Sequence, residues 1–194
     1  MTTVLLTGFE PFGTATSNPS GEIVKQISGD NIVTAILPVA YAGSAERLLE
    51  LIAEHNPDVV ICLGQAEGRT QITPEKVAIN LDDARLADNE GVLRNDVKIL
   101  DDGPDAYFST LPINELVAAI KARGIPAAVS LSAGAFLCNH VFYVAQNKFV
   151  GSDVRSGFVH VPLMDSQATE FPGLPTMPLD QMVTAVRAML EVVA

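Results

Sequence analysis

The segment Val59–Gly64 reads VVICLG and is the part of the sequence that most directly indicates the fold. Five consecutive apolar residues closed by a glycine predict a short strand with both faces buried. Two similar strands are predicted at Val4–Thr7 and Ile32–Leu37. Uniformly apolar strands occur in parallel sheets that carry helices on both faces, so we expect an α/β protein.

Helical patterns alternate with the predicted strands along the chain. Further strands are predicted at Val77–Leu81, Ala127–Leu131 and Gly157–Pro162. The predicted helices are Ser20–Ile27, Ala42–His55, Ile113–Arg123, Cys138–Phe149 and Leu179–Val192. This alternation favours a three-layer α/β/α sandwich with a mainly parallel, twisted sheet. The length of 194 residues predicts a single α/β domain, residues 1–194.

Two segments, Gly8–Pro19 and Asp82–Asp105, are too rich in turn-forming residues for regular structure. Loops of this length within a domain are often functional. In open sheets with helices on both faces, ligands bind outside the carboxyl ends of the strands. The loop Gly8–Pro19 follows a predicted strand at that edge, so we expect it to lie near the site.

The charge balance narrows the classes of partner. Lys and Arg total 12 against 23 Asp and Glu, which gives a net charge of −11. A surface this acidic disfavours nucleic acids and anionic membranes. No signal peptide and no apolar run of about 18 residues is evident. Because two cysteines cannot form a disulfide framework, we expect a cytoplasmic protein with reduced thiols.

Cys138 is the residue best placed for chemistry. It follows a predicted strand and the small-residue turn Ser132–Ala135, and it opens a predicted helix. A helix N-terminus favours a thiolate and offers backbone N–H groups to an oxyanion. The alternative is that Cys138 is a small buried hydrophobic residue. That alternative is the interpretation given to Cys62, which lies inside an apolar strand.

Three histidines are candidates for a general base. His140 stands two positions after Cys138, about 200° around the helix axis, and so points away from the thiol. It is interpreted as structural, with a hydrogen bond to the backbone. His55 lies near a helix end and is interpreted as a surface cap. His160 lies near the carboxyl end of a predicted strand, so elimination favours it as the base.

A carboxylate is expected to orient the imidazole. Spacing alone leaves four candidates open, Glu75, Asp82, Asp83 and Asp165. No HExxH, CxxC, GxGxxG or Walker A pattern is present, so neither a metal nor a nucleotide cofactor is expected. The residues therefore predict an intracellular cysteine hydrolase whose third catalytic group is undecided.

Four segments in this order resemble the pyroglutamyl peptidase I (pyrrolidone carboxyl peptidase) family of cysteine peptidases. They are LLTGFEPFGTATSNPS at Leu5–Ser20, GQAEGRTQITPEKVAIN at Gly64–Asn80, SAGAFLCNHVFY at Ser132–Tyr143 and GFVHVPLMDSQ at Gly157–Gln167. Each segment alone is modest evidence, but together they are specific and span most of the chain.

The resemblance implies roles that spacing could not assign. Cys138 corresponds to the nucleophile of the family, His160 to its general base and Glu75 to its orienting carboxylate. Arg85 corresponds to a residue that helps to hold the oxyanion. The residues implied to line or border the pyroglutamyl pocket are Phe9, Phe12, Asn18, Gln65 and Phe136. The whole chain would then be one catalytic domain.

The resemblance further implies that the enzyme removes an N-terminal pyroglutamyl residue from peptides through a thioester acyl-enzyme. Its partner would be the peptide substrate, it would need no cofactor, and it would form a homo-oligomer, a dimer or tetramer. Glu67 and Ala87 depart from the pattern, in which Gly and Pro are usual at these positions. Two alternatives remain, a non-catalytic binding module and, because of Glu67, a cysteine hydrolase acting on another small amide.

Overall fold

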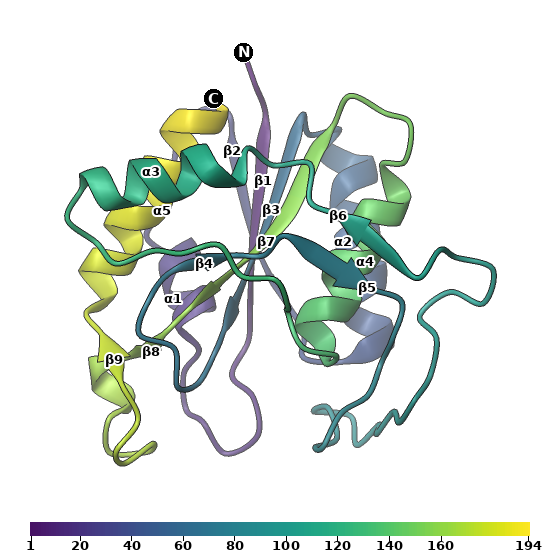
Figure 1. Ribbon diagram of the computed structural model, residues 1–194, viewed down its shortest axis with the longest axis horizontal. Helices are drawn as coiled ribbons and strands as arrows, with labels where there is room; N and C mark the ends of the chain where they lie inside the picture. The colour runs from purple at the N-terminus through teal and green to yellow at the C-terminus, as the bar shows by residue number, and fades with distance from the viewer.

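A five-stranded sheet forms the centre of the molecule, as the computed structural model of residues 1–194 shows (Figure 1). Its strands, in spatial order, are β2 (Ile32–Leu37), β1 (Val4–Phe9), β3 (Val59–Gln65), β7 (Arg155–Val161) and β4 (Thr73–Pro74). All neighbouring strands pair in parallel except the short edge strand β4, which runs antiparallel to β7. The predicted mainly parallel sheet is confirmed.

Helices cover both faces of the sheet, so the predicted three-layer sandwich is also confirmed. One face packs against α1 (Pro19–Val24), α3 (Ile113–Ala122) and α5 (Leu179–Val193). The other face packs against α2 (Tyr41–His55) and α4 (Leu137–Lys148). Figure 1 shows the two helical layers on either side of the strands.

The central strand β3 explains why the sheet is buried on both sides. Its alternate residues Val59, Ile61 and Leu63 belong to the core beneath α1, α3 and α5. Val60 and Cys62 belong to the core beneath α2 and α4. All five are fully buried, because side chains alternate between the two faces of a strand. A run of apolar residues is therefore required at this position.

Cys62 is a core residue, as its place in the apolar strand indicates. Its side chain packs among apolar residues of the α2 and α4 layer. Burial raises the pKa of its thiol to about 12, although the neighbouring Thr7 side chain acts in the opposite direction. Because Cys62 is fully buried among apolar side chains, a substrate cannot reach its thiol.

Three predicted elements differ from the structure. Helix α1 begins at Pro19, because the Asn18 side chain accepts the Ser20 N–H (3.1 Å) and proline suits the first helical position. It ends at Val24, before the predicted end at Ile27. The predicted strand at Val77–Leu81 is β5 (Val77–Ile79), which pairs with β6 (Ala106–Phe108) in a separate antiparallel ribbon.

The predicted strand Ala127–Leu131 is wrong as a member of the sheet. This segment makes only isolated bridges, Ile72 with Ala127 and Glu75 with Ser130, along the outer side of β4. Val129 is 39% exposed and Leu131 is 73% exposed, so these two side chains do not face a covered layer. An extended edge segment therefore precedes the turn that leads to Cys138.

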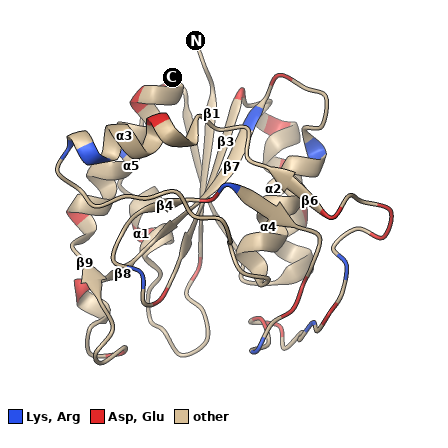
Figure 2. Ribbon diagram, viewed as in Figure 1, with Lys and Arg blue, Asp and Glu red and all other residues tan.

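The remaining segments are short elements and loops. A second small ribbon pairs β8 (Leu163–Met164) with β9 (Thr176–Met177), and the 3-10 helix Asp165–Gln167 lies between them. The segment Asp82–Asp105 contains no helix or strand, as predicted, and carries many of the acidic residues (Figure 2). None of the helices combines the length and apolar character needed to cross a membrane.

The burial of β3 leads to a stability prediction. We expect Ile61→Ala to lower the free energy of unfolding by about 2–5 kcal/mol, because it leaves a cavity in a fully packed layer. The matched control is Ile36→Ala on edge strand β2, where Ile36 is 40% exposed and the loss should stay below about 1 kcal/mol. Denaturant unfolding of both variants measures the difference, and equal losses would contradict the two-sided core.

Candidate active site

Cys138 lies in the first turn of α4, directly over Gly64 at the end of β3. A Cβ atom added to Gly64 would stand 2.9 Å from Cys138 Sγ and 2.7 Å from a ring carbon of Phe158. Cβ atoms in protein structures essentially never lie this close to atoms of other residues, so glycine is the residue that fits at position 64. The absence of a side chain at position 64 lets the thiol rest against the carboxyl end of the sheet.

His160 lies beside Gly64 on the neighbouring strand. The two residues are partners in the parallel register of β3 and β7, so the imidazole projects from the same face of the sheet that Cys138 approaches. His160 is buried, with 4% of its surface exposed. Sheet pairing therefore brings together a thiol and an imidazole from distant parts of the sequence.

Glu75 is the carboxylate that contacts His160. Its Oε1 lies 2.8 Å from His160 Nδ1, and its own N–H donates to the Phe158 carbonyl at 2.8 Å. An ionised carboxylate only accepts hydrogen bonds, so Nδ1 carries the proton and Nε2 is left as the basic nitrogen. The antiparallel pairing of β4 with β7 sets this contact, which only Glu75 of the four candidate carboxylates makes.

Arg69 also belongs to the site, although the sequence interpretation did not include it. Its Nη1 donates to Glu75 Oε1 (2.7 Å) and to Thr73 Oγ1, and its Nη2 donates to the Ser132 carbonyl (3.1 Å). The guanidinium thus joins Glu75 to the turn before Cys138. Its position just after β3, at the carboxyl edge of the sheet, is the signal that could have identified it.

Burial controls the ionisation of the three groups. Desolvation, with the nearby charge of Glu75, raises the pKa of Cys138 to about 12, which corrects the expectation of a resting thiolate at the helix N-terminus. Desolvation also lowers the pKa of His160, against the opposing effect of Glu75. Burial alone would raise the pKa of Glu75, but the hydrogen bond and charge of His160, with Arg69, hold it below its ordinary value.

Asp82, the second candidate carboxylate, pairs with His140 instead. Its Oδ2 lies 2.9 Å from His140 Nδ1 and accepts a hydrogen bond from Arg94 Nη1 at 2.7 Å. Arg94 also lies over the Tyr41 ring, 4.4 Å from its centroid. The expected structural role of His140 fits this arrangement, but the expected backbone partner was wrong because a buried carboxylate occupies that position.

The other two candidates make no contact with His160. The Asp83 backbone N–H donates to the Ala135 carbonyl at 2.8 Å, while its side chain is exposed. Asp165 is exposed at the start of a 3-10 helix. Of the four carboxylates, only Glu75 is within hydrogen-bond distance of the candidate base.

A pocket of about 200 Å³ opens beside Cys138. All five residues that the resemblance assigned to a substrate pocket line it, together with three others and the thiol itself. The lining residues are Phe9, Phe12, Asn18, Val39, Gln65, Glu67, Phe136, Leu137 and Cys138. Aromatic side chains form much of the wall, with the Phe12 and Phe136 ring centroids 5.2 Å apart. The pocket is mainly apolar and ends at a candidate nucleophile.

Two polar lining residues already have partners within the chain. The Asn18 side chain accepts from the Ser20 N–H and donates to the Glu10 carbonyl at 3.0 Å, which ties the Gly8–Pro19 loop to α1. The Gln65 Oε1 atom accepts from Gln167 Nε2 at 3.0 Å. Asn18 and the Gln65 side-chain oxygen are therefore already paired, which leaves the Gln65 Nε2 group and the nearby backbone as sources of free polar groups.

Arg85 is exposed and does not line the pocket. The bond from the Asp83 N–H to the Ala135 carbonyl holds the nearby backbone against the turn before Cys138. Arg85 is therefore attached to a segment beside the site, and its role at the oxyanion stays a prediction.

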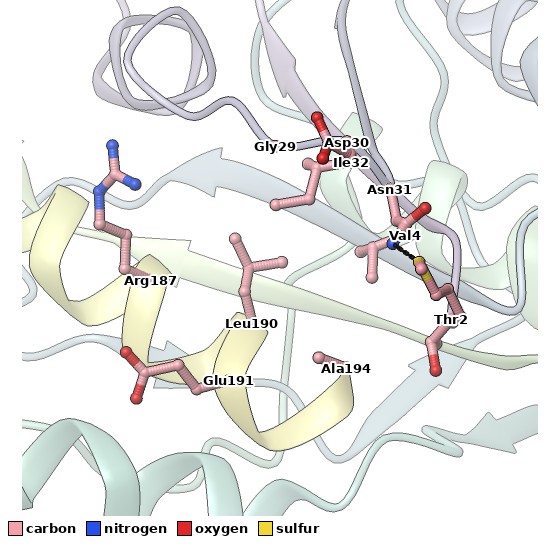
Figure 3. Close-up of a pocket in the computed structure, with 11 residues that line it drawn as sticks. Thr2, Val4, Gly29, Asp30, Asn31, Ile32, Arg187, Leu190, Glu191 and Ala194 are labelled. Atoms are coloured by element: carbon pink, nitrogen blue, oxygen red, sulfur yellow. Dashed lines mark hydrogen bonds between the residues drawn. The ribbon is translucent and has the colours of Figure 1, made fainter.

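A larger hollow of about 630 Å³ lies at the opposite end of the sheet (Figure 3). It is formed by the N-terminal residues, the segment before β2 and the end of α5, and the Asn31 amide there donates to Met1 Sδ at 3.2 Å. No cysteine or histidine lines it. Nowhere in the chain do three or more His, Cys, Asp or Glu side chains gather in a metal-binding arrangement.

Known proteins are similar in sequence to this chain over nearly its full length. A family profile described as Pyroglutamyl peptidase matches residues 2–194. Pyrrolidone-carboxylate peptidase of Bacillus cytotoxicus is 43% identical over 199 residues, covering 99% of this chain and 93% of that protein. The Cupriavidus pinatubonensis protein of the same name is 46% identical over 195 residues, covering 96% and 90%. The chain belongs to the pyroglutamyl peptidase family.

Solved structures of pyroglutamyl peptidases have the same fold. Pyroglutamyl peptidase I from Bacillus amyloliquefaciens has a TM-score of 0.96 at 43% identity, covering 99% of this chain and 94% of that one. A mutant pyrrolidone carboxyl peptidase from Pyrococcus furiosus has a TM-score of 0.93 at 38% identity, covering 98% and 97%. The resemblance drawn from four sequence segments is confirmed, and this pyroglutamyl peptidase family member is a cysteine-type peptidase.

The close approach at Gly64 leads to a prediction for this peptidase. We expect Gly64→Ala to lower kcat/KM at least tenfold, because the new methyl group must displace Cys138 Sγ or Phe158, and a shift of about 1 Å can cost about 100-fold. Peptidase assays and the rate of Cys138 alkylation measure the effect.

Gly29→Ala is the matched control, since its Cβ would meet only the movable end of the Ile32 side chain, at 3.0 Å. This variant should keep wild-type activity. Unchanged activity in Gly64→Ala would show that the thiol does not depend on the space above Gly64.

Proposed function

We propose that the protein hydrolyses the bond after an N-terminal pyroglutamyl residue, with Cys138, His160 and Glu75 as its catalytic groups. The observation that carries the proposal is the small apolar pocket whose wall includes the Cys138 thiol, in a chain of the pyroglutamyl peptidase family. The same His–carboxylate pairing also fits the activation of a thiol nucleophile.

The pocket suits a flat lactam. The pyroglutamyl ring has no free amine, so it can enter an apolar cavity without leaving a charge unpaired. The side chains of Phe9, Phe12 and Phe136 would contact its faces. Backbone groups near Gln65 would pair with the lactam N–H and carbonyl, and the side-chain oxygen of Gln65 is already bonded to Gln167. An unblocked N-terminus would bring an ammonium group into the same space at a large cost.

The first step is the formation of an acyl-enzyme. His160 Nε2 takes the proton from Cys138 as sulfur attacks the carbonyl carbon of the pyroglutamyl residue. Glu75 accepts the Nδ1–H bond and stabilises the imidazolium that forms. Because the resting thiol is protonated, His160 must take its proton before or during the attack. Arg69 keeps the carboxylate in place through its bond to Oε1.

The oxyanion would form against the Cys138 N–H and the Arg85 guanidinium. The first N–H groups of α4 have no partner within the helix and carry its positive dipole end. One oxyanion donor typically contributes about 100- to 1000-fold in rate. When the tetrahedral intermediate collapses, the C–N bond breaks and His160 returns its proton to the departing amine.

Hydrolysis of the thioester completes the cycle. His160 accepts a proton from water as the water oxygen attacks the thioester carbonyl, and the C–S bond then breaks. The sulfur regains its proton, and free pyroglutamate leaves the pocket. The cycle needs no metal or cofactor, since every proton moves between these groups and water.

Residues 1–194 are proposed to act as one catalytic domain in the cytoplasm, where thiols stay reduced. A homo-oligomer, a dimer or tetramer, is proposed as the working form. The apolar side chains Phe108 and Leu131 are 69% and 73% exposed and would be available for contact between copies. Light scattering of the purified protein tests the oligomer.

Substrate comparison tests the main proposal. Release of a reporter amine from pyroglutamyl, prolyl and unblocked glutamyl substrates should occur only with the first. Cys138→Ser should reduce that turnover about 1000-fold or more, because the hydroxyl is a poorer nucleophile in this setting. Absence of thiol-dependent turnover of the pyroglutamyl substrate would refute the proposal. Equal turnover of all three would refute the lactam specificity.

The pH profile tests the assignment of the base. His160 must be neutral to accept the thiol proton, and burial lowers its pKa from 6.5. We therefore expect kcat/KM to fall as the pH drops, with a midpoint below 6.5, since protonated His160 is inactive. Arg69→Gln should move the midpoint upward, because the Arg69 charge helps to lower this pKa. A wild-type midpoint above neutral pH would contradict the assignment.

A further inference from the structure

Glu67 is the only charged residue among the nine that line the Cys138 pocket. It occupies the tip of the turn Ala66–Arg69, which is closed by the Arg69 N–H donating to the Ala66 carbonyl (3.4 Å). Gly68 follows it with a φ of +79°, a conformation that glycine adopts without strain. The turn thus places Glu67 at the pocket.

The Glu67 carboxylate has no partner within the chain. Its side chain is exposed, and it forms no hydrogen bond or ion pair with another residue. The nearest cation in the sequence is Arg69, but that guanidinium is bonded to Glu75, Thr73 and the Ser132 carbonyl. The charge of Glu67 therefore faces whatever enters or leaves the pocket.

The position of Cys138 indicates which part of a substrate passes Glu67. The scissile carbonyl must lie against Cys138 Sγ, with the acyl group in the apolar interior beside the buried residues Phe9, Val39 and Leu137. The rest of the peptide runs outward into solvent. An exposed lining residue lies at the mouth, along the path of the residues that follow the cleaved bond.

We propose that Glu67 is a specificity-determining residue that favours peptides with a cationic side chain directly after pyroglutamate. The inference rests on the proposed function and extends it to the leaving side of the substrate. Lysine or arginine at that position would be attracted by the carboxylate, and glutamate or aspartate would be repelled. The contact is the same before and during the reaction, so it acts mainly through KM.

The expected size of the preference follows from the exposure of the pair. A solvent-exposed ion pair changes an equilibrium about two- to fivefold, and salt screens it over about 10 Å at 0.1 M. The preference should therefore be moderate and should decrease at high ionic strength.

Three peptides that differ only in the residue after pyroglutamate, Lys, Gln or Glu, test the proposal. The wild type should show kcat/KM in the order Lys, Gln, Glu, with steps of about two- to fivefold at low salt, carried by KM. Glu67→Gln should remove the order, and Glu67→Lys should reverse it. High salt should reduce the differences in kcat/KM among the three peptides for both the wild type and Glu67→Lys.

Glu115→Gln is the matched control, since Glu115 is an exposed carboxylate in α3, outside the Cys138 pocket. It should keep the wild-type order. Measurable turnover of the Gln peptide by Glu67→Gln shows that the variant is folded, so a lost order of the three peptides then reports on the charge. Equal kcat/KM of the wild type on all three peptides at low salt would overturn the role of Glu67 and leave the proposed function in place. No turnover of any of them would overturn the proposed function and this inference with it.

Discussion

The close approach of α4 to the end of β3 is the constraint on which the site depends. Cys138 Sγ rests where a side chain of Gly64 would be, so the thiol is positioned by the sheet itself. The register of β3 and β7 then puts His160 beside that point, and the antiparallel edge strand β4 delivers Glu75 to His160. Packed and paired backbone, rather than loops, sets the geometry of the three groups.

The same packing determines how the groups are charged. Removing water raises the pKa of the Cys138 thiol and lowers that of His160, so both rest in neutral forms. Arg69 and His160 keep Glu75 ionised despite its burial. A neutral thiol is less prone to oxidation than a thiolate, so desolvation protects Cys138 in the resting protein. In the proposed mechanism, its reactivity depends on proton transfer to His160.

The sequence was sufficient for the layers and for the position of Cys138 at the start of a helix, because apolar runs such as Val59–Leu63 and a cysteine opening a helix are local signals. It was insufficient for the carboxylate, because strand pairing between β4 and β7 decides the partner of His160, and pairing is not local. Arg69 was missed for the same reason. The segment Ala127–Leu131 has a strand-like composition, but its place outside β4 leaves half of it facing water.

Two sets, each made of a histidine, a carboxylate and an arginine, show why placement matters more than composition. His160, Glu75 and Arg69 form one set, and His140, Asp82 and Arg94 form the other, with nearly equal contact distances. His140 is only two residues from Cys138, yet the helix turns it about 200° away. Its ring packs edge-on against Tyr41, with centroids 5.4 Å apart, in the interior between α2 and α4. The second set therefore ties the Asp82–Asp105 segment to the helix that carries Cys138. Only the first set lies on the sheet face where the thiol and the pocket meet.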